Sequence, residues 1–514
     1  MTATEHEQHQ VIDFLTGALS ENGVPPKIVM THISVIFLTG GQAYKLKRAV
    51  KYSFLDFTSL DARKDACAKE VEINKRTAPS IYKGVIAITE MDGSYELGGS
   101  GPVREWLVEM ARFDEDTLFD RLARVDRGLR RPMIEDLADV ISDFHATATV
   151  KIAGGGAEGI RKIAENNVRA FAQQQETGIF DASRVSALTS TTLKMIDQFA
   201  GVLDVRRDGG RVRACHGDLH LRNICLVNGK PTLFDAIEFS SDFSDIDVLY
   251  DLAFLLMDLD AHDRRRLSSF LLNRYLDVGE EDMDAFRVLP IFLTMRAQIR
   301  AHVGAASAMS QSDPGMAAQE TANAQRYLDL AETFVQPNSP RVVAVGGLSG
   351  SGKSRLAREI ASYLGRAPGA RVVRTDVVRK RLCGIHPNKT LGPEGYTLEV
   401  TEKTYEAFLD QAKAAIMSGQ CVVLDAVFAN PAHRKAAEEL ARSCKVPFNG
   451  IWVDAPEDVR VERVISRKRN VSDVTEDVAR DQTGYNLGEV DWAKVDSSGK
   501  KKETVRQGLS ILKL

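Results

Sequence analysis

An eight-residue run, GLSGSGKS at positions 347–354, constrains the fold of this chain more than any other feature. The run fits the pattern G-x-x-x-x-G-K-[ST], and it stands between the apolar, β-branched run RVVAV (341–345) and a segment with helical periodicity. Glycines let backbone N–H groups turn inward around phosphate oxygens, and the amino end of the helix adds a favourable dipole. Because all the fixed positions are present, we predict a nucleotide-binding loop here and not an ordinary glycine-rich turn.

The side chains of this loop have separate predicted roles. Lys353 is predicted to reach the β- and γ-phosphates of ATP and to take part in catalysis. The hydroxyl of Ser354 is predicted to bind Mg²⁺. The residues predicted to bind the nucleotide in this loop are Gly347, Ser349, Gly350, Ser351, Gly352, Lys353 and Ser354.

Two acidic residues end strand-like runs in the same part of the chain. Asp425 ends the run VVLD, where a carboxylate could hold Mg²⁺ directly or through water. Asp376 ends the run RVVRTD, where a carboxylate could accept the proton of a hydroxyl that attacks the γ-phosphate. Ligands bind at the carboxyl edge of open α/β sheets, so we expect both side chains at the site, although each could instead cap a helix or a turn.

After the segment QPNSP (336–340), short apolar runs alternate with helical segments. Buried strands separated by helices indicate a parallel sheet covered on both faces. We therefore predict a linker at 336–340 and an α/β domain with a parallel sheet at 341–514. Three arginines, Arg460, Arg463 and Arg467, are spaced so that they share one helix face. They could bind the nucleotide and the transferring phosphoryl group, or they could form a solvated basic face.

On these motifs the region resembles a group of P-loop kinases that includes gluconate kinase, zeta toxins and the kinase part of polynucleotide kinase. The resemblance depends on GLSGSGKS, TDVVRKRL, VVLDAVF and the arginine-rich segment. It implies that Asp376 contacts the accepting hydroxyl and that Arg379 meets an anionic group of the substrate. It also implies an ATP-dependent kinase whose acceptor these motifs do not identify.

A second motif, HGDLHLRN at 216–223, lies in the amino-terminal part of the chain. Asp218 and Asn223 have the D-x-x-x-x-N spacing of a kinase catalytic loop, and Asp235 follows a strand-like run. In phosphoryl transfer, a carboxylate near the attacking hydroxyl acts as the base and oxygen ligands hold Mg²⁺. We therefore predict Asp218 as the catalytic base, Asn223 and Asp235 as Mg²⁺ ligands, and His216 as a residue that holds the loop.

The segment from Val35 to Phe334 resembles the aminoglycoside phosphotransferase-like kinases. The resemblance implies a two-lobed, α+β, protein-kinase-like fold, with one lobe at 1–110 and a helical lobe at 111–335. It also implies that Lys45 in AYKLK binds phosphates of ATP. The other roles that rest on this resemblance are those of Glu70 as the ion-pair partner of Lys45 (with Glu72 as the competing choice), Glu105–Met110 (EWLVEM) as an adenine-binding hinge, and Asp251 as the residue that holds the catalytic loop.

Two departures from that family pattern bear on activity. Only Gly40 and Gly41 stand where a full glycine-rich phosphate flap is expected. The motif after the catalytic loop is DAIE, which puts Glu238 near the metal in an open role. A regulatory pseudokinase is therefore the alternative, but we prefer an active kinase because the lysine, the base and both metal ligands are present.

Charge is distributed unevenly along the chain. From residue 337 to the end there are 29 Lys+Arg against 22 Asp+Glu (+7), and the remainder has 38 against 49 (−11), within a net charge of −4. Such asymmetry is compatible with two parts that bind ligands of different charge, and equally with drift in the solvated surface.

Composition restricts the class of protein. Apolar residues make up 44% and charged residues 27% of the 514 residues, as in globular proteins with several cores. No apolar run approaches the roughly 18 residues that span a bilayer, and the polar start MTATEHEQHQ does not fit a signal peptide. The six cysteines show no CxxC spacing, which is typical of thiols in a reducing compartment. We expect a cytoplasmic protein without a membrane partner.

Together these features predict a bifunctional, ATP- and Mg²⁺-dependent phosphotransferase that acts on hydroxyl groups of small molecules. Two alternatives stay open. One half could bind ATP only to regulate the other, or the part at 341–514 could phosphorylate polynucleotide 5′ ends. The second alternative is less favoured, because no basic stretch is interleaved with aromatic residues that would stack on bases.

Overall fold

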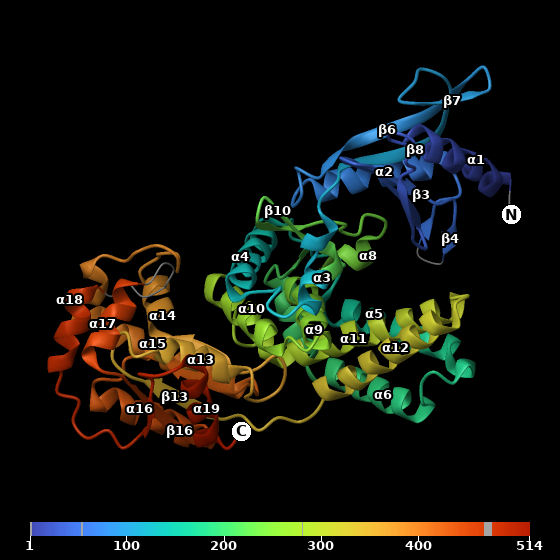
Figure 1. The fold of residues 1–514 in the computed structure, drawn as a ribbon. Helices are drawn as coiled ribbons and strands as arrows, with labels where there is room; N and C mark the ends of the chain where they lie inside the picture. Colours follow the sequence, from blue (N-terminus) through green and yellow to red (C-terminus); the bar gives the residue numbers. More distant parts are fainter. Residues whose placement is uncertain (1–2, 53–54, 280, 467–474) are drawn as a thin grey trace. The chain divides into compact units, whose positions relative to one another are not determined.

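The computed structural model describes residues 3–52, 55–279, 281–466 and 475–514 (Figure 1). The chain divides into two compact units. The first unit comprises Met1–Gly159 and Asp204–Asp258, and the second unit comprises Ile160–Leu203 and Leu259–Leu514. The polypeptide therefore passes from the first unit to the second twice.

An antiparallel sheet forms the amino-terminal part of the first unit. Its six strands run in the order β1-β2-β3-β8-β6-β7. Alternate residues of the central strands, such as Phe37 and Leu46, are buried in one core with Leu15 of helix α1. The elements are α1 (Ala3–Ala18), β1 (Lys27–Met30), β2 (Ser34–Leu38), β3 (Gln42–Lys47), β4 (Lys51–Tyr52), β5 (Leu55–Asp56), α2 (Leu60–Asn74), β6 (Tyr82–Met91), β7 (Ser94–Leu97) and β8 (Val103–Ala111).

Helix α2 packs on this sheet and carries a functional side chain into it. The helix begins after Ser59, whose hydroxyl accepts a hydrogen bond from the N–H of Ala62. Its face toward strand β8 includes Val71 and the fully buried Glu70. A carboxylate at such a depth requires cationic partners, and strand β3 supplies them.

The carboxyl-terminal part of the first unit holds the HGDLHLRN segment between two short antiparallel strand pairs, β9–β12 and β10–β11. Helix α9 is buried along almost its whole length and accepts hydrogen bonds from the backbone of that segment. The elements are η1 (Glu115–Thr117), α3 (Phe119–Arg124), α4 (Arg131–Thr147), α7 (Ala200–Asp208), β9 (Val212–Ala214), η3 (Leu221–Asn223), β10 (Ile224–Val227), β11 (Lys230–Leu233), α8 (Ser241–Ser244), β12 (Asp245–Asp247) and α9 (Val248–Ala261).

Helices make up the first part of the second unit. Helix α12 begins after Asp313, whose carboxylate accepts a hydrogen bond from the N–H of Met316. It packs closely along α11, since a Cβ added at Gly304 would lie 3.3 Å from the Cβ of Ala324. The elements are α5 (Gly156–Gln173), η2 (Gln175–Thr177), α6 (Ala182–Gln198), α10 (Arg265–Val278), α11 (Ala285–Ser310) and α12 (Pro314–Phe334).

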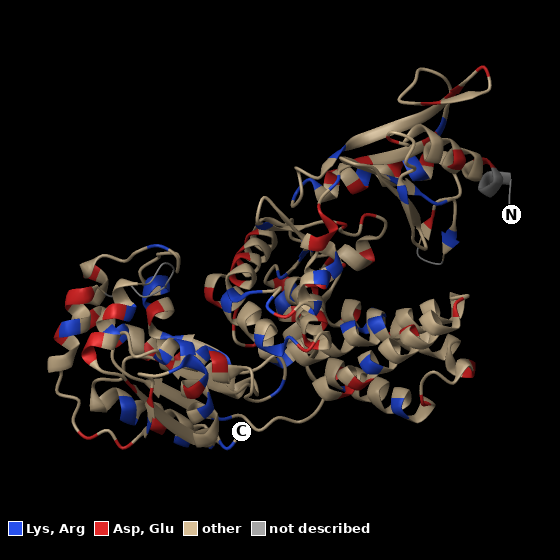
Figure 2. Cartoon of the chain, in the orientation of Figure 1, with Lys and Arg blue, Asp and Glu red and all other residues tan. Residues whose placement is uncertain are grey.

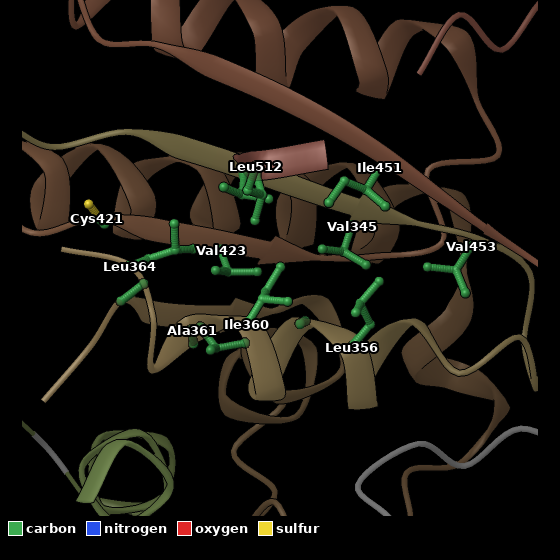
Figure 3. Packing of buried hydrophobic residues seen from close by; sticks show 14 of the residues in the cluster. Val345, Leu356, Ile360, Ala361, Leu364, Cys421, Val423, Ile451, Val453 and Leu512 are labelled. Carbon is green, nitrogen blue, oxygen red and sulfur yellow. The ribbon is translucent and has the colours of Figure 1, made fainter. Parts of the chain in front are cut away.

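A five-stranded, all-parallel sheet with the order β14-β15-β13-β16-β17 forms the rest of the second unit, which confirms the predicted α/β fold. Every residue of β13, β14 and β15 is buried, as expected for strands covered on both faces. Figure 3 shows Leu356 and Ile360 of α13 packed against Val345 and Val423 of the sheet. The elements are β13 (Val342–Gly346), α13 (Lys353–Ala361), β14 (Arg371–Arg374), α14 (Thr375–Leu382), η4 (Pro393–Tyr396), α15 (Leu398–Met417), β15 (Val422–Asp425), α16 (Pro431–Ser443), β16 (Phe448–Asp454), α17 (Glu457–Ile465), α18 (Glu476–Asp481), η5 (Gln482–Gly484), β17 (Ala493–Asp496) and α19 (Lys501–Leu512).

Two further observations concern surface and segmentation. Figure 2 shows basic and acidic residues interspersed on helices such as α17 and α18. Among the helices of the described residues, none is long and apolar enough to cross a membrane.

Helix α12 ends at Phe334 and β13 begins at Val342. The domain limits at 1–110, 111–335, 336–340 and 341–514 stay predictions.

Candidate active sites

A series of alternating charges lies in the interior of the first unit. Lys45 Nζ in β3 lies 2.8 Å from Glu70 Oε1 and 2.6 Å from Asp235 Oδ1. Lys47, two residues along the same strand, lies 2.5 Å from Glu70 Oε2 and also pairs with Glu238. We call the series Asp235–Lys45–Glu70–Lys47–Glu238 the charge ladder. Each buried charge in it has an opposite charge beside it, which offsets the cost of removing it from water.

The charge ladder sets the ionisation of its members. Burial alone would raise the pKa of Glu70, but the ammonium groups of Lys45 and Lys47 outweigh it and lower that pKa to about 2. Burial alone would lower the pKa of Lys45, but Asp235 and Glu70 raise it well above its ordinary value. The side chain of Asp235 is 42% exposed, whereas that of Glu70 is fully buried. Asp235 is therefore the carboxylate of the ladder that a ligand can reach.

Two points that the sequence left open are answered by these contacts. Glu70, and not Glu72, is the ion-pair partner of Lys45. Glu238 turns toward Lys47, and burial raises its pKa although Lys47 acts against that rise. Glu238 thus pairs with a buried lysine, and Asp235 is the more exposed of the two carboxylates.

Helix α9 holds the catalytic loop at both ends. The two carboxylate oxygens of Asp251 accept hydrogen bonds from the backbone N–H groups of His216 (3.0 Å) and Gly217 (2.9 Å). Asp258, two helical turns farther along, accepts one from the N–H of Leu221 at 3.0 Å. Gly217 has φ +83°, and a Cβ there would lie 2.8 Å from a backbone oxygen, so the turn requires glycine.

His216 links the loop to the strand that precedes Asp235. Its Nε2 lies 2.9 Å from the carbonyl oxygen of Phe234, and its Nδ1 accepts a hydrogen bond from the N–H of Asp218 at 3.3 Å. Burial lowers the pKa of His216, so the ring is neutral at neutral pH and its Nε2–H donates to Phe234. A neutral ring engaged on both sides serves the holding role that the sequence predicted.

Asp218 and Asn223 contact each other. Asn223 Nδ2 donates to Asp218 Oδ2 at 2.9 Å and to its backbone oxygen at 3.0 Å. His220 Nε2 lies 3.3 Å from the same carboxylate oxygen, and the Asp218 side chain is 37% exposed. Because the amide nitrogen of Asn223 donates to Asp218, its amide oxygen is the atom that can bind a cation.

Asp235 has a left-handed backbone, with φ +62°. Its N–H donates to the hydroxyl of Tyr82 at 3.1 Å, and the next N–H, of Ala236, donates to Asn74 Oδ1 at 2.8 Å. Side chains of the amino-terminal sheet and of α2 therefore hold this uncommon conformation. A carboxylate oxygen from Asp235 and an amide oxygen from Asn223 are hard oxygen ligands, so these residues fit an Mg²⁺ ion.

The predicted hinge, Glu105–Met110, lies instead within strand β8. Leu107 and Val108 pair with β3 on one side and with β6 on the other. Glu105 is buried beside Arg63, with Nε and Oε1 2.9 Å apart. The backbone of a strand paired on both sides is used by the sheet, so the predicted hinge position is wrong and the connector begins after Ala111.

In the second unit the GLSGSGKS loop joins β13 to α13, and three of its glycines have positive φ. A Cβ on Gly347 (φ +145°) would lie 2.3 Å from the carbonyl oxygen of Val453. A Cβ on Gly350 (φ +85°) would lie 2.3 Å from that of Arg460. Gly352 (φ +93°) begins α13, and among the described residues the buried Ser351 hydroxyl has no hydrogen-bond partner. A concave backbone with an unsatisfied hydroxyl at a helix amino end fits a phosphate group.

Ser354 and Asp425 form an oxygen pair beside this loop. The Ser354 hydroxyl donates to Asp425 Oδ1 at 3.0 Å. Asp425 ends β15 and its Oδ2 accepts a hydrogen bond from Nε of the buried Arg374 at 3.3 Å. A hydroxyl and a carboxylate in contact, next to Lys353 at the start of α13, fit an Mg²⁺–nucleotide site. Arg374 was not among the predicted site residues. The sequence feature that could have indicated it is an arginine at the carboxyl end of a buried strand.

Asp376 and Arg379 both lie in helix α14. Asp376 is in the first turn of that helix, two residues after the end of β14 at Arg374. Arg379 is buried; its Nη1 donates to Gly395 O at 2.8 Å and its guanidinium lies 4.9 Å from the ring centre of Tyr396. Arg379 thus connects α14 to the segment before α15.

The arginines of α17 lie behind the phosphate loop. Arg460 is buried, and its Nη1 donates to the carbonyl oxygens of Ser349 (3.3 Å) and Ala479 (3.1 Å). Arg463 Nη2 donates to the backbone oxygen of Ser497 at 2.6 Å. Arg460 therefore belongs to neither predicted class, since it supports the loop backbone. Arg467 lies outside the described residues.

Two family models match separate stretches of the chain. A model of the phosphotransferase enzyme family matches residues 95–289, and a model of an AAA domain matches residues 342–485. Among solved structures, a gluconokinase from Sinorhizobium meliloti 1021 is 22% identical, with 35% of this chain and 94% of that chain covered and a TM-score of 0.26. A choline/ethanolamine kinase family protein from Mesorhizobium loti is 12% identical, with 63% and 99% covered and a TM-score of 0.37.

A relative matches nearly the whole length of the chain. The uncharacterized protein Rv2004c of Mycobacterium tuberculosis (strain ATCC 25618 / H37Rv) is 30% identical over 500 residues, which are 94% of this chain and 94% of that protein. The matched ranges contain the HGDLHLRN segment with Asp235 and the GLSGSGKS loop with Asp425, whereas Lys45 and Glu70 precede the first range. The chain therefore belongs to the family of Rv2004c, and it is a kinase-type phosphotransferase in which a phosphotransferase-family domain precedes an AAA domain.

Proposed function

We propose that the protein is a bifunctional kinase with two independent Mg²⁺–ATP sites, each of which transfers a phosphoryl group to a hydroxyl of a small molecule. One observation carries the proposal: each unit brings a lysine together with two oxygen ligands for a cation. In the first unit these are Lys45, which contacts Asp235, and Asn223, whose backbone oxygen accepts a hydrogen bond from the N–H of Phe234 next to Asp235. In the second unit they are Lys353 with Ser354 and Asp425, which stand at one end of the sheet.

In the first unit Asp218 is the base. Its carboxylate, positioned by Asn223 and His220, accepts the proton of the acceptor hydroxyl. The hydroxyl oxygen forms a bond to the γ-phosphorus while the bond from that phosphorus to the bridging oxygen breaks, and ADP leaves. Lys45 neutralises phosphate charge, and Glu70 keeps Lys45 in place. Mg²⁺, when bound by Asp235 and Asn223, would supply further neutralisation of the phosphates.

In the second unit Asp376 is the proposed base and Lys353 the cation that meets the β- and γ-phosphates. Backbone N–H groups of the loop, set by Gly347, Gly350 and Gly352, would surround the phosphates. The bonds made and broken are those of the first reaction, with the hydroxyl proton passing to Asp376. Arg463 would lie beside the loop end, since its Nη1 is 4.0 Å from a Cβ built on Gly352.

The stoichiometry of nucleotide binding tests the proposal. We expect calorimetry of the full chain with a non-hydrolysable ATP analogue and Mg²⁺ to give two equivalents per chain. Lys45→Met should remove one equivalent and Lys353→Ala the other, because each lysine belongs to one site. A single equivalent in the unmodified chain would contradict the proposal.

Turnover separates an enzyme from an ATP-binding regulator in each unit. Asp218→Asn removes the base but keeps the hydrogen-bonding shape, so it should lower one acceptor-dependent ADP release by about 10²–10⁴-fold and keep both binding equivalents. Lys353→Ala should abolish a different acceptor-dependent reaction. If Asp218→Asn leaves ADP release unchanged for every acceptor, the first unit is a binding module.

A further inference from the structure

Strand β14 is an edge strand of the parallel sheet, and helix α10 supplies a partner for its backbone. An edge strand carries N–H and C=O groups with no neighbouring strand. Asn273 of α10 pairs with one such group in the strand and with one in the residue just before it. Its Nδ2 donates to the carbonyl oxygen of Ala370 at 3.1 Å, and its Oδ1 accepts from the N–H of Val372 at 2.7 Å. One side-chain amide thus takes the place of a further strand at this point.

A buried ion pair joins the same two elements. Arg371, the first residue of β14, is 1% exposed, and its Nη1 lies 2.8 Å from Oδ1 of Asp277 in α10. The same Nη1 lies 3.2 Å from Asn273 Oδ1. A buried charge that loses its partner is strongly destabilised, so this pair holds α10 and β14 in one arrangement.

The other end of β14 reaches the nucleotide site. Arg374, the last residue of the strand, donates to Asp425, which in turn accepts from Ser354. Strand β14 is only four residues long, so the contacts of α10 with Arg371 lie close to Arg374.

We infer that Asn273 and Asp277 are positioning residues of the nucleotide site in the second unit. They fix β14, β14 fixes Arg374, and Arg374 sets the carboxylate that would bind Mg²⁺. Both residues lie before 342–485, the part matched by the AAA domain, so the site depends on a helix outside that domain. The inference rests on the proposed function of this site and assigns it two further residues.

The chain offers a matched control on the same helix. Arg266 of α10 pairs with Glu359 of α13 at 2.9 Å, and the Arg266 side chain is 54% exposed. This pair also joins α10 to the nucleotide-binding part, but exposed pairs contribute little to stability. Arg266→Ala therefore removes a contact between the same regions without touching β14.

The test uses the full chain with Lys45→Met, which leaves only the second site to bind nucleotide. Affinity for a non-hydrolysable ATP analogue is measured by calorimetry with and without Mg²⁺ in this parent, and again after adding Asn273→Ala, Asp277→Asn or Arg266→Ala. Asn273→Ala and Asp277→Asn should weaken Mg²⁺-dependent binding by about tenfold and Mg²⁺-free binding by less than about twofold. Without Asp277, Arg371 loses its buried partner and β14 is held less firmly, so Arg374 no longer keeps the Asp425 carboxylate in position. Arg266→Ala should match the parent under both conditions.

The outcomes are distinguishable. A parent that binds no nucleotide contradicts the proposed function itself. A parent that binds, with Asn273→Ala and Asp277→Asn equal to it, overturns the inference. Equal weakening with and without Mg²⁺ also overturns it, because that result shows general destabilisation. If melting curves show that Asp277→Asn does not fold, the uncharged Asn273→Ala decides the matter alone.

Discussion

The two candidate sites prepare for phosphate by different physical means. The first unit uses side chains: five buried or half-buried charges alternate in the charge ladder, and the lysine is held before any ligand arrives. The second unit uses its backbone: glycines with positive φ curve the loop, and other backbone oxygens pack directly against them. Both arrangements hold donors in place, so neither needs large rearrangement on binding.

The difference predicts where each site is vulnerable. A site made of paired charges fails when one charge is removed, because its partner stays buried without compensation. A site made of backbone fails when an atom is added, because a Cβ has nowhere to go. The predictions below exploit this contrast, beginning with the largest expected effect.

Removing one rung of the charge ladder should cost the most. Lys47→Met leaves Glu70 and Glu238 with one lysine fewer, so the free energy of unfolding of the first unit should fall by about 3–5 kcal/mol. Urea denaturation of the full chain measures it. Lys51→Met is the control, since Lys51 pairs with Asp56 at 2.7 Å but its side chain is 70% exposed. Equal effects of the two variants would show that the ladder is not a stabilising feature.

Acid should weaken the second unit through the buried His302, and the lowered pKa of His216 gives the first unit a dependence of the same sign. Burial lowers the pKa of His302 in α11 to about 4. Its pKa in the unfolded chain is about 6.5, so the unfolded chain binds the proton first and the second unit loses up to about 3 kcal/mol of stability as pH falls from 6.5 to 4. Glu70, with a pKa of about 2, contributes stability above about pH 4.5 and loses it only as pH falls toward 2. The charge ladder should therefore be intact between pH 6.5 and 4.5.

Tryptophan fluorescence can follow each unit in this experiment. Trp106 is in the first unit, and Trp452 and Trp492 are in the second. In the full chain, Trp106→Phe leaves a signal from the second unit alone. The urea concentration at the midpoint of that unfolding signal should decrease as the pH is lowered from 6.5 to 4. His302→Gln should flatten that dependence. A midpoint that stays constant in the presence of His302 would contradict the prediction.

Adding a methyl group to the phosphate loop should give the smallest of these effects on stability but a specific one on binding. Gly350→Ala places a Cβ against the Arg460 carbonyl oxygen at positive φ, so nucleotide affinity at the second site should fall by about tenfold to a hundredfold. Gly384→Ala is the control, because Gly384 also has φ +67° but a Cβ there meets nothing within 4 Å. Calorimetry in the Lys45→Met chain measures both. If the two variants bind nucleotide alike, the close packing of Gly350 does not govern binding at this site.

Local motifs made much of each site predictable. The GLSGSGKS loop stands between a strand and a helix as its pattern requires, and the parallel sheet follows from buried runs such as VVLD. Lys45 meets Glu70 because a strand and the following helix bring these positions together, a geometry that the family resemblance supplied. In each case the signal lies within a short stretch of chain.

Contacts between distant residues were beyond the sequence. Strand β17 (AKVD) has one buried position and no apolar run, so only its pairing with β16 defines it. No local sequence pattern predicts that Lys47 is buried, because its partner Glu238 is 191 residues away. Asn273 binds a strand almost 100 residues later through one amide. Such side chains are explained by the tertiary fold and not by local periodicity.

The two aspartates of α9 that accept hydrogen bonds from the catalytic loop restrict how the length of that loop can change during evolution. Asp251 and Asp258 are seven residues apart, a rise of about 10.5 Å along a rigid rod. The stretch of HGDLHLRN between its anchored N–H groups must match that span, so one residue gained or lost there would release an anchor. Substitutions within the motif should therefore be tolerated during evolution, whereas insertions and deletions between the two anchored N–H groups should be selected against.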